Sequence, residues 1–369
     1  MTENTAKPGS VKKPRVILRF IAAALGLSGL IICIIFSDSV KSGINSGVQL
    51  CLGVLIPSLF LPMTLCAFLQ QSGIVSLLGK YTDRFARFVF NISGTAFTAF
   101  VLGCISGYPS GAVLARSLYE SGEIDMKTAR RLCCVCVCAG PAFILLGVGD
   151  GLMHSRAAGY ILFCSHIFSA VILLFMSGLF EKRRRNNANM PDRKSKSGGF
   201  GLTLAVTGSI SGSARSMLGI CAYTVLFSAV ISLLGRILSG GAMSAATALC
   251  EVTNACVYFA NNHNIPMISA ALGFSGLSVI AQIISAAGAV CDIKRLLVCR
   301  VAAAALSYAI CSPLLIVFPQ PIAVQSNMQT AAFYISSGTM AMSCLLIAAT
   351  AVFLYSLYQH SEPNLHDFF

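Results

Sequence analysis

The chain has 369 residues, of which 56% are hydrophobic and 11% are charged, and its mean hydropathy is +0.79. Soluble domains carry about 25% charged residues, so this composition excludes an ordinary soluble enzyme and predicts an all-α polytopic membrane protein. The formal net charge is +13, but the basic residues lie in short stretches between apolar runs. That distribution is typical of orientation in a membrane, so we expect no nucleic-acid partner.

Apolar runs long enough to cross a bilayer follow one another along the chain. They occupy residues 16–36, 47–70, 89–106, 132–150, 157–180, 217–238, 240–259, 267–290, 297–319 and 331–358. We therefore expect about 8 to 10 hydrophobic segments. The first run follows a Lys-rich N-terminus and lacks a small-residue cleavage site, so we interpret it as a retained span and not as a signal peptide.

The pattern divides the chain into five parts. Residues 1–44 form a basic tail and the first span, 45–180 a first repeat, 181–199 a basic linker, 200–320 a second repeat, and 321–369 a last span and tail. The linker is rich in Asn, Ser and Gly and has no apolar face, which predicts a disordered cytoplasmic connector.

A helix breaker lies inside the first repeat, at residues 106–112. Its members are Ser106, Gly107, Tyr108, Pro109, Ser110, Gly111 and Ala112, with apolar residues on both sides. In a bilayer, broken backbone persists only where protein or water satisfies its polar groups. We expect a half-helix that starts at Gly111, with Ser110 as its cap and Arg116 nearby, and its N–H groups would favour an anionic solute. The alternative is an ordinary loop at the membrane surface.

Gly140 and Pro141 interrupt the run 132–150. Proline removes a helix hydrogen bond, so this position is either a packing kink or a kink that also lines a binding site.

Glu251 is an acid within the apolar run 240–259, followed by Thr253 and Asn254. Intramembrane carboxylates are costly and mark proton or cation sites by default. We expect Glu251 to hold a coupling proton or cation, or to order the second hairpin. The alternative is a loop acid near the outer interface.

Ser275, Gly276, Ser278 and Gln282 form a polar, small-residue stripe in the run 267–290. Ser275, Ser278 and Gln282 are spaced by three and four residues, which places them on one helix face. They either line the binding site or pack helices together.

The sequence lacks the motifs that are typical of ATP hydrolysis and of metal binding. No Walker phosphate loop is present, and the cysteine-rich run 133–138 holds one C-x-x-C pair without a second pair or a histidine to complete a metal site. The 16 cysteines lie mostly in apolar runs, where cysteine acts as a small hydrophobe. We expect no enzyme activity, no metal and no cofactor.

Orientation rules favour an inverted arrangement of the two repeats. If 89–119 is a re-entrant hairpin from the cytoplasmic side and 240–259 one from the outside, only Lys41, Arg156 and Arg236 of the 26 basic residues remain outside. The N-terminus is then cytoplasmic, and the two halves have opposite topology, as in many secondary transporters.

Together these motifs resemble the YlbJ-type sporulation integral membrane proteins, which carry nucleoside-recognition (Gate) domains. The resemblance covers roughly residues 45–320, through residues 106–112, 122–124, 139–144, 251–254 and 273–282. The sequence departs from the family pattern at Asn254 and Ala255, where a glycine commonly follows Glu-x-Thr.

The resemblance implies a sporulation transporter that moves dipicolinate, a small anionic solute, across the mother-cell or outer forespore membrane. Its expected partners are this solute, a coupling proton or cation, the lipid bilayer, and either a second copy of the chain or other sporulation membrane proteins. The alternatives are a nucleoside-type transporter and a non-transporting membrane assembly protein needed for spore maturation.

Overall fold

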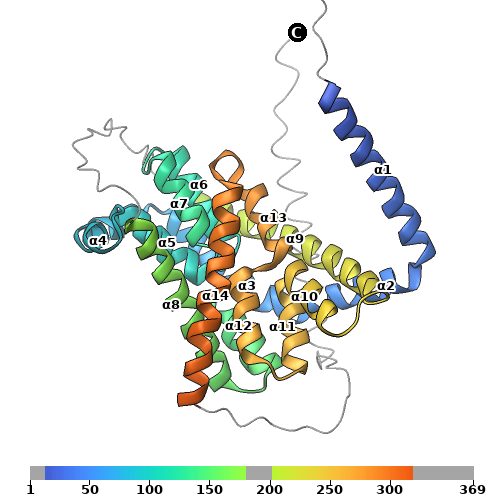
Figure 1. Ribbon diagram of the computed structural model, residues 1–369. Coiled ribbons are helices and arrows are strands. Elements are labelled where there is room, and N and C mark those ends of the chain that lie inside the picture. Colours follow the sequence, from blue (N-terminus) through green and yellow to red (C-terminus); the bar gives the residue numbers. More distant parts are fainter. Residues whose placement is uncertain (1–12, 180–201, 319–369) are drawn as a thin grey trace, which may run out of the picture.

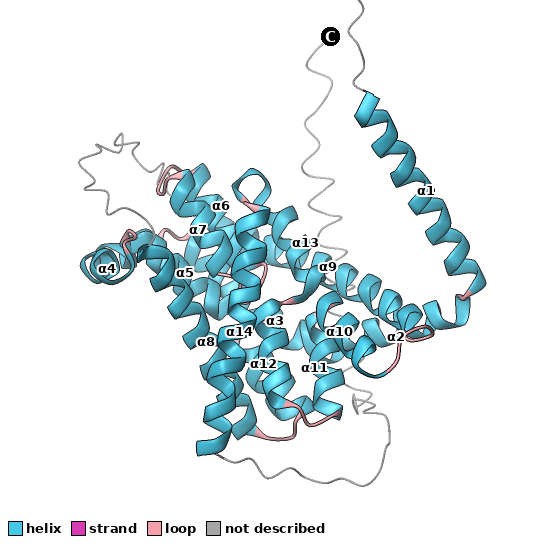
Figure 2. Ribbon diagram, viewed as in Figure 1, coloured by secondary structure: helices cyan, strands magenta, loops and turns pink. Residues whose placement is uncertain are grey.

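The computed structural model describes residues 13–179 and 202–318, and within these ranges every regular element is a helix (Figures 1 and 2). The prediction of an all-α membrane protein is therefore confirmed for the described part of the chain. The basic tail before residue 13, the linker 181–199 and the predicted run 331–358 lie outside the described residues.

The first half of the chain contains a long helix, several short ones and a second long one. In order these are α1 (Lys13–Ile35), α2 (Ser37–Leu50), the π-helical η1 (Cys51–Leu55), α3 (Ile56–Gln71), α4 (Ile74–Phe90), α5 (Gly94–Ser106), α6 (Ser110–Glu120), α7 (Met126–Val135), the π-helical η2 (Phe143–Leu152) and α8 (Arg156–Leu179). Residues Ser37–Gln71 are continuous, so α2, η1 and α3 act as one long helix.

The second half comprises α9 (Leu202–Leu234), α10 (Gly240–Cys250), α11 (Val252–Asn261), α12 (Ile265–Phe274), α13 (Gly276–Ala287), the 3-10 turn η3 (Gly288–Val290) and α14 (Ile293–Val317). The predicted run 217–238 begins too late, because α9 already starts at Leu202. Its first turns are rich in serine, threonine and glycine, which lowers their hydropathy. Their hydroxyls bond carbonyls of the preceding turn, as between Thr207 Oγ1 and Thr203 O at 2.9 Å, so they are compatible with a membrane helix.

Five helices of the described part are long and apolar enough to cross a membrane. They are Ser37–Gln71, Arg156–Leu179, Thr203–Leu234, Ile265–Val290 and Ile293–Val317. Helices α4 and α5 satisfy the same criteria only as a pair, and the chain bends by 89° between them. The chain is therefore a multi-pass membrane protein, but several predicted spans are broken into half-helices.

The two halves repeat one order of elements. A long helix (α2–α3 or α9) precedes a pair of short helices (α5 and α6, or α10 and α11), then a broken helix (α7 and η2, or α12 and α13), then one long helix (α8 or α14). The contacts are reciprocal, since α6 packs on α13 while α11 packs on η2, and α7 packs on α14 while α12 packs on α8. Helix α4 has no counterpart among the described helices of the second half.

Two arginines that the orientation rule counts as cytoplasmic are buried within the helix bundle. Arg131 donates from Nη2 to Phe90 O at 2.6 Å and to Leu174 O at 2.7 Å, and so ties the end of α4 to α8. Arg300 donates from Nη2 to Cys134 O at 2.6 Å. Both side chains are buried, because helix ends and breaks inside the bundle offer carbonyls that need donors.

Candidate functional site

The two breaks of the first half lie against each other. The chain breaks at Gly107, where φ is +80°, and again after α7. A β-carbon at Gly107 would lie 3.2 Å from Gly140 N, and one at Gly140 would lie 3.0 Å from Ile105 O. The predicted neighbourhood of residues 106–111 with Gly140 is therefore present, and a β-carbon at either glycine would crowd the facing backbone.

The second half repeats this relationship. A β-carbon at Gly276 would lie 3.1 Å from both Glu251 Cα and Val252 N. Gly276 and Ser275 have φ values of +76° and +74°, so the chain breaks between α12 and α13. The prediction that Ser275 shares one helix face with Ser278 and Gln282 is therefore wrong, because a left-handed residue ends the helix there.

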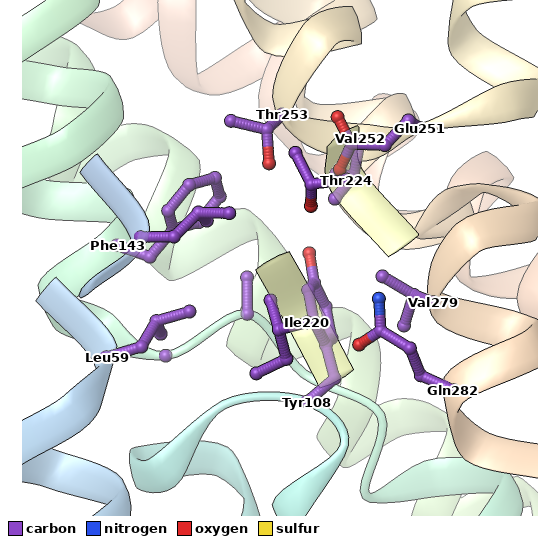
Figure 3. A pocket seen from close by; sticks show the side chains of 13 residues that line it. Leu59, Tyr108, Phe143, Ile220, Thr224, Glu251, Val252, Thr253, Val279 and Gln282 are labelled. Carbon is purple, nitrogen blue, oxygen red and sulfur yellow. The ribbon is translucent and has the colours of Figure 1, made fainter. Parts of the chain in front are cut away.

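A small cavity lies where the breaks of both halves meet (Figure 3). It is lined by Leu55, Leu59, Tyr108, Ala139, Gly140 and Phe143 of the first half and by Ile220, Thr224, Glu251, Val252, Thr253, Val279 and Gln282 of the second. Five residues predicted for the site are in this lining: Tyr108, Gly140, Glu251, Thr253 and Gln282.

Glu251 lies between α10 and α11 and is only 1% exposed. Its Oε2 accepts hydrogen bonds from Asn254 N at 2.7 Å and from Asn254 Nδ2 at 2.8 Å, and the same amide donates to Ser228 Oγ of α9 at 2.8 Å. Glu251 therefore caps α11, whose N-terminus favours a negative charge. Glu251 is therefore a buried helix cap and not a solvent-exposed side chain.

Two polar atoms in this lining have no hydrogen-bond partner among the described residues. They are the Tyr108 hydroxyl and Gln282 Oε1, one from each half, and Figure 3 shows both side chains at the cavity. Gln282 Nε2 donates to Ser278 Oγ at 3.2 Å. Buried polar atoms are normally paired, so these two have hydrogen-bonding capacity left for a water molecule or a solute.

The break after α7 is held by side chains that the sequence analysis did not assign to the site. Arg300 Nη1 donates to Val137 O at 2.7 Å, and His166 Nε2 accepts from Ala139 N at 2.9 Å. Both residues could have been found from the sequence, because His166 and Arg300 are polar side chains within apolar runs. Such residues usually face the interior of a helix bundle.

Ten other residues predicted for the site are not in the cavity lining. These are Ser106, Gly107, Pro109, Ser110, Gly111, Pro141, Asn254, Ser275, Gly276 and Ser278. Helix α6 begins at Ser110, one residue earlier than expected, and Pro109 occupies the cap position, so Ser110 does not cap it with its side chain.

Arg116 is also outside the cavity lining. Its Nε pairs with Glu120 Oε1 at 2.7 Å on an exposed face of α6, and its Nη1 donates to Ala286 O at 3.3 Å. Within the described chain no basic side chain lines the cavity. An anionic solute would therefore depend on hydroxyl, amide and backbone donors.

The cavity is closed to a solute in this conformation. The volume that the centre of a water molecule can occupy in the cavity is about 10 Å³. The cavity therefore has room for about one water molecule. The helices around it must separate before any larger molecule can enter.

Among the described residues no three His, Cys, Asp or Glu side chains are grouped so that they could hold a metal ion. Comparison of the chain with models of protein families, with curated proteins and with solved structures finds no match. The resemblance noted from the sequence motifs therefore stays a prediction.

Proposed function

We propose that this protein is a secondary transporter and that the cavity between the two pairs of breaks is its solute site. The observation that carries the proposal is the pair of buried, unpartnered polar atoms, Tyr108 OH and Gln282 Oε1, which come from opposite halves. In transporters built from repeats, the solute binds between broken helices at the repeat interface.

The two halves are inverted repeats in this proposal. The repeated order of elements and the reciprocal contacts of α6 with α13 and of α11 with η2 support it. The predicted distribution of basic residues supports opposite topology and a cytoplasmic N-terminus. Rocking of one half against the other would open the closed cavity to each side in turn.

The transported solute in this proposal is a small dicarboxylate, dipicolinate, as the sequence resemblance implies. The hydroxyls of Tyr108, Thr224 and Thr253 surround the cavity and can donate to carboxylate oxygens. The Glu251 carboxylate in the same lining repels an anion unless it carries a proton. Binding of the anion and of a proton at Glu251 would then favour each other, which couples transport to a proton gradient.

A neutral, nucleoside-like solute is the second candidate. The lining combines an aromatic ring at Tyr108 with the Gln282 amide. None of the described residues that line the cavity has a basic side chain. This set suits a ring with hydrogen-bonding edges.

Uptake of labelled dipicolinate into liposomes that contain the purified chain tests the proposal, with and without an inward proton gradient and with nucleosides as competitors. Saturable uptake that the gradient increases supports a proton-coupled dicarboxylate transporter. Inhibition by nucleosides, with no dipicolinate uptake, favours the second candidate. If the folded protein moves neither solute, the transporter proposal fails and an assembly role at the spore envelope takes its place.

A further inference from the structure

Helix α4 (Ile74–Phe90) has no counterpart among the described helices of the second half, and one of its faces is packed against α5. A β-carbon at Gly79 would lie 2.7 Å from Thr95 N, so the two backbones are in close contact. Ala86 and Phe90 are buried on the same side. The rest of the helix surface faces away from the bundle.

The outer surface of α4 carries two stripes of different chemistry. Tyr81, Phe85 and Phe88 are 82%, 54% and 79% exposed and form what we call the aromatic stripe. Exposed Lys80, Arg84 and Arg87 form the basic stripe. Both sets have spacings of four and three residues, which align side chains along a helix, and the stripes lie about 100° apart around the axis.

The position of α4 in the fold places it at the end of a membrane span. A β-carbon at Gly178, next to the last residue of span α8, would lie 2.6 Å from Phe90 O at the end of α4. The Arg131 guanidinium bonds both Phe90 O and Leu174 O. Figure 1 shows α4 end-on while α8 and α14 run lengthwise, so α4 lies across the direction of the spans.

We propose that α4 lies in the plane of the membrane surface and that its basic stripe binds the headgroups of anionic phospholipids. The aromatic stripe occupies the boundary between headgroups and acyl chains, where aromatic side chains and amphipathic helices are favoured. The basic stripe then lies at the level of the lipid phosphates, and Lys and Arg at this level attract acidic lipids.

The charges on α4 favour this ligand. Arg87 Nε pairs with Asp83 Oδ2 at 2.6 Å, while Asp83 Oδ1 accepts from Gly94 N at 2.8 Å. Lys80 and Arg84 therefore have no acidic partner among the described residues, and the stripe keeps a net positive charge. A free anion in water would satisfy these cations but would leave the aromatic stripe exposed to water, whereas a lipid surface accommodates both stripes.

The chain contains no tryptophan, so a single introduced tryptophan reports its own surroundings by fluorescence. The Phe88→Trp protein is reconstituted in vesicles that contain equal fractions of phosphatidylcholine and phosphatidylglycerol, with bromine on the acyl chains of one lipid or the other. Phe168→Trp, at an exposed position in the middle of span α8, serves as the matched control for contact with acyl chains.

We expect brominated phosphatidylglycerol to quench Phe88→Trp at least about twofold more than brominated phosphatidylcholine, because anionic lipid gathers at the stripe. The two lipids should quench Phe168→Trp equally. Adding Lys80→Gln and Arg84→Gln to Phe88→Trp should abolish the difference, whereas Lys294→Gln and Arg295→Gln, which remove the same charge from α14, should retain it.

Two results would overturn the proposal. Equal quenching of Phe88→Trp by both lipids would show that α4 has no preference for anionic lipid. Absence of quenching at Phe88→Trp, with normal quenching at Phe168→Trp, would show that α4 does not lie at the lipid surface. In that case a change in the emission wavelength with protein concentration would identify a second copy of the chain as its cover.

Discussion

Gly276 lies so close to Glu251 that a β-carbon on the glycine would be 3.1 Å from the glutamate Cα. In the other half Gly107 and Gly140 have the same relationship, at 3.2 Å from β-carbon to backbone nitrogen. Each half thus joins its two chain breaks through a close backbone contact at a glycine, where a β-carbon would crowd the facing chain. Tyr108 and Glu251, which line the cavity, directly adjoin these contacts, so the glycines set the position of the candidate site.

Gly276→Ala should destabilise the protein and abolish most uptake. The left-handed conformation costs a residue with a β-carbon about 1–2 kcal/mol, and the crowding against Glu251 adds about 1–3 kcal/mol. Gly73→Ala is the matched control, because Gly73 has φ +75° but open space around its α-carbon. Thermal unfolding in detergent measures the stability of the Gly276→Ala and Gly73→Ala variants, and the liposome assay measures their uptake. Equal losses in the two variants would show that the contact with Glu251 is unimportant.

Tyr108→Phe should leave stability unchanged or slightly higher, because the lost hydroxyl has no hydrogen-bond partner among the described residues. If that hydroxyl donates to the solute, the KM for uptake should rise about tenfold, which corresponds to roughly 1.4 kcal/mol. Tyr160→Phe, on an exposed part of α8, should change neither value. An unchanged KM in Tyr108→Phe would place the solute elsewhere.

Glu251→Gln should fold normally but lose transport driven by a proton gradient. The glutamine side-chain oxygen can still accept from Asn254 N and cap α11, but the amide cannot carry the coupling proton. We expect at least a tenfold loss of gradient-driven uptake, about 1.4 kcal/mol, with unchanged amounts of protein in the membrane. Full gradient-driven uptake by this variant would exclude the proposed role of Glu251 while leaving the location of the cavity untouched.

Arg300→Met should destabilise the protein strongly. The guanidinium satisfies the carbonyls of Cys134 and Val137 inside the bundle, and each buried polar group left without a partner costs about 1–3 kcal/mol. Arg295→Met removes an exposed arginine from the same helix and should have little effect. Comparable unfolding temperatures for the two variants would show that water can replace Arg300 at the break.

The turns that follow the two hairpins should lie on opposite sides of the membrane. Gly122 follows α6 and His263 follows α11, and both have positive φ, at +78° and +52°. A protease site inserted at either turn in sealed vesicles of known orientation reports its side by cleavage. Cleavage of both sites from one side would exclude the inverted arrangement of the halves.

Much of the candidate site could be predicted because chain breaks are local. The combination of Gly107 with Pro109 disfavours a continuous helix wherever it occurs, an acid such as Glu251 is costly within an apolar run, and the structure breaks the chain at both places. Thr224 was not predicted, since a threonine inside a long apolar helix is common and has no distinguishing neighbour in the sequence.

The long basic side chains were the least predictable from sequence. Arg116, expected near the solute, pairs with Glu120 on an exposed face, whereas Arg300, counted among the cytoplasmic basic residues, bonds carbonyls inside the bundle. An arginine side chain reaches in several directions from its backbone position, so the carbonyls and carboxylates that the fold places around it decide its course.

The amino-acid sequence by itself determined that this protein is helical, resides in a membrane and breaks its backbone near Gly107 and Glu251. The first two properties follow from composition, the break at Gly107 from the local preferences of glycine and proline, and the hairpin around Glu251 from the distribution of basic residues and the cost of an intramembrane acid. Only the tertiary structure decided that Tyr108, Glu251 and Gln282 line one cavity and that α4 lies across the end of a span. Both depend on how helices from distant parts of the chain pack, because contacts between the two halves, and not local preference, set the distances between them.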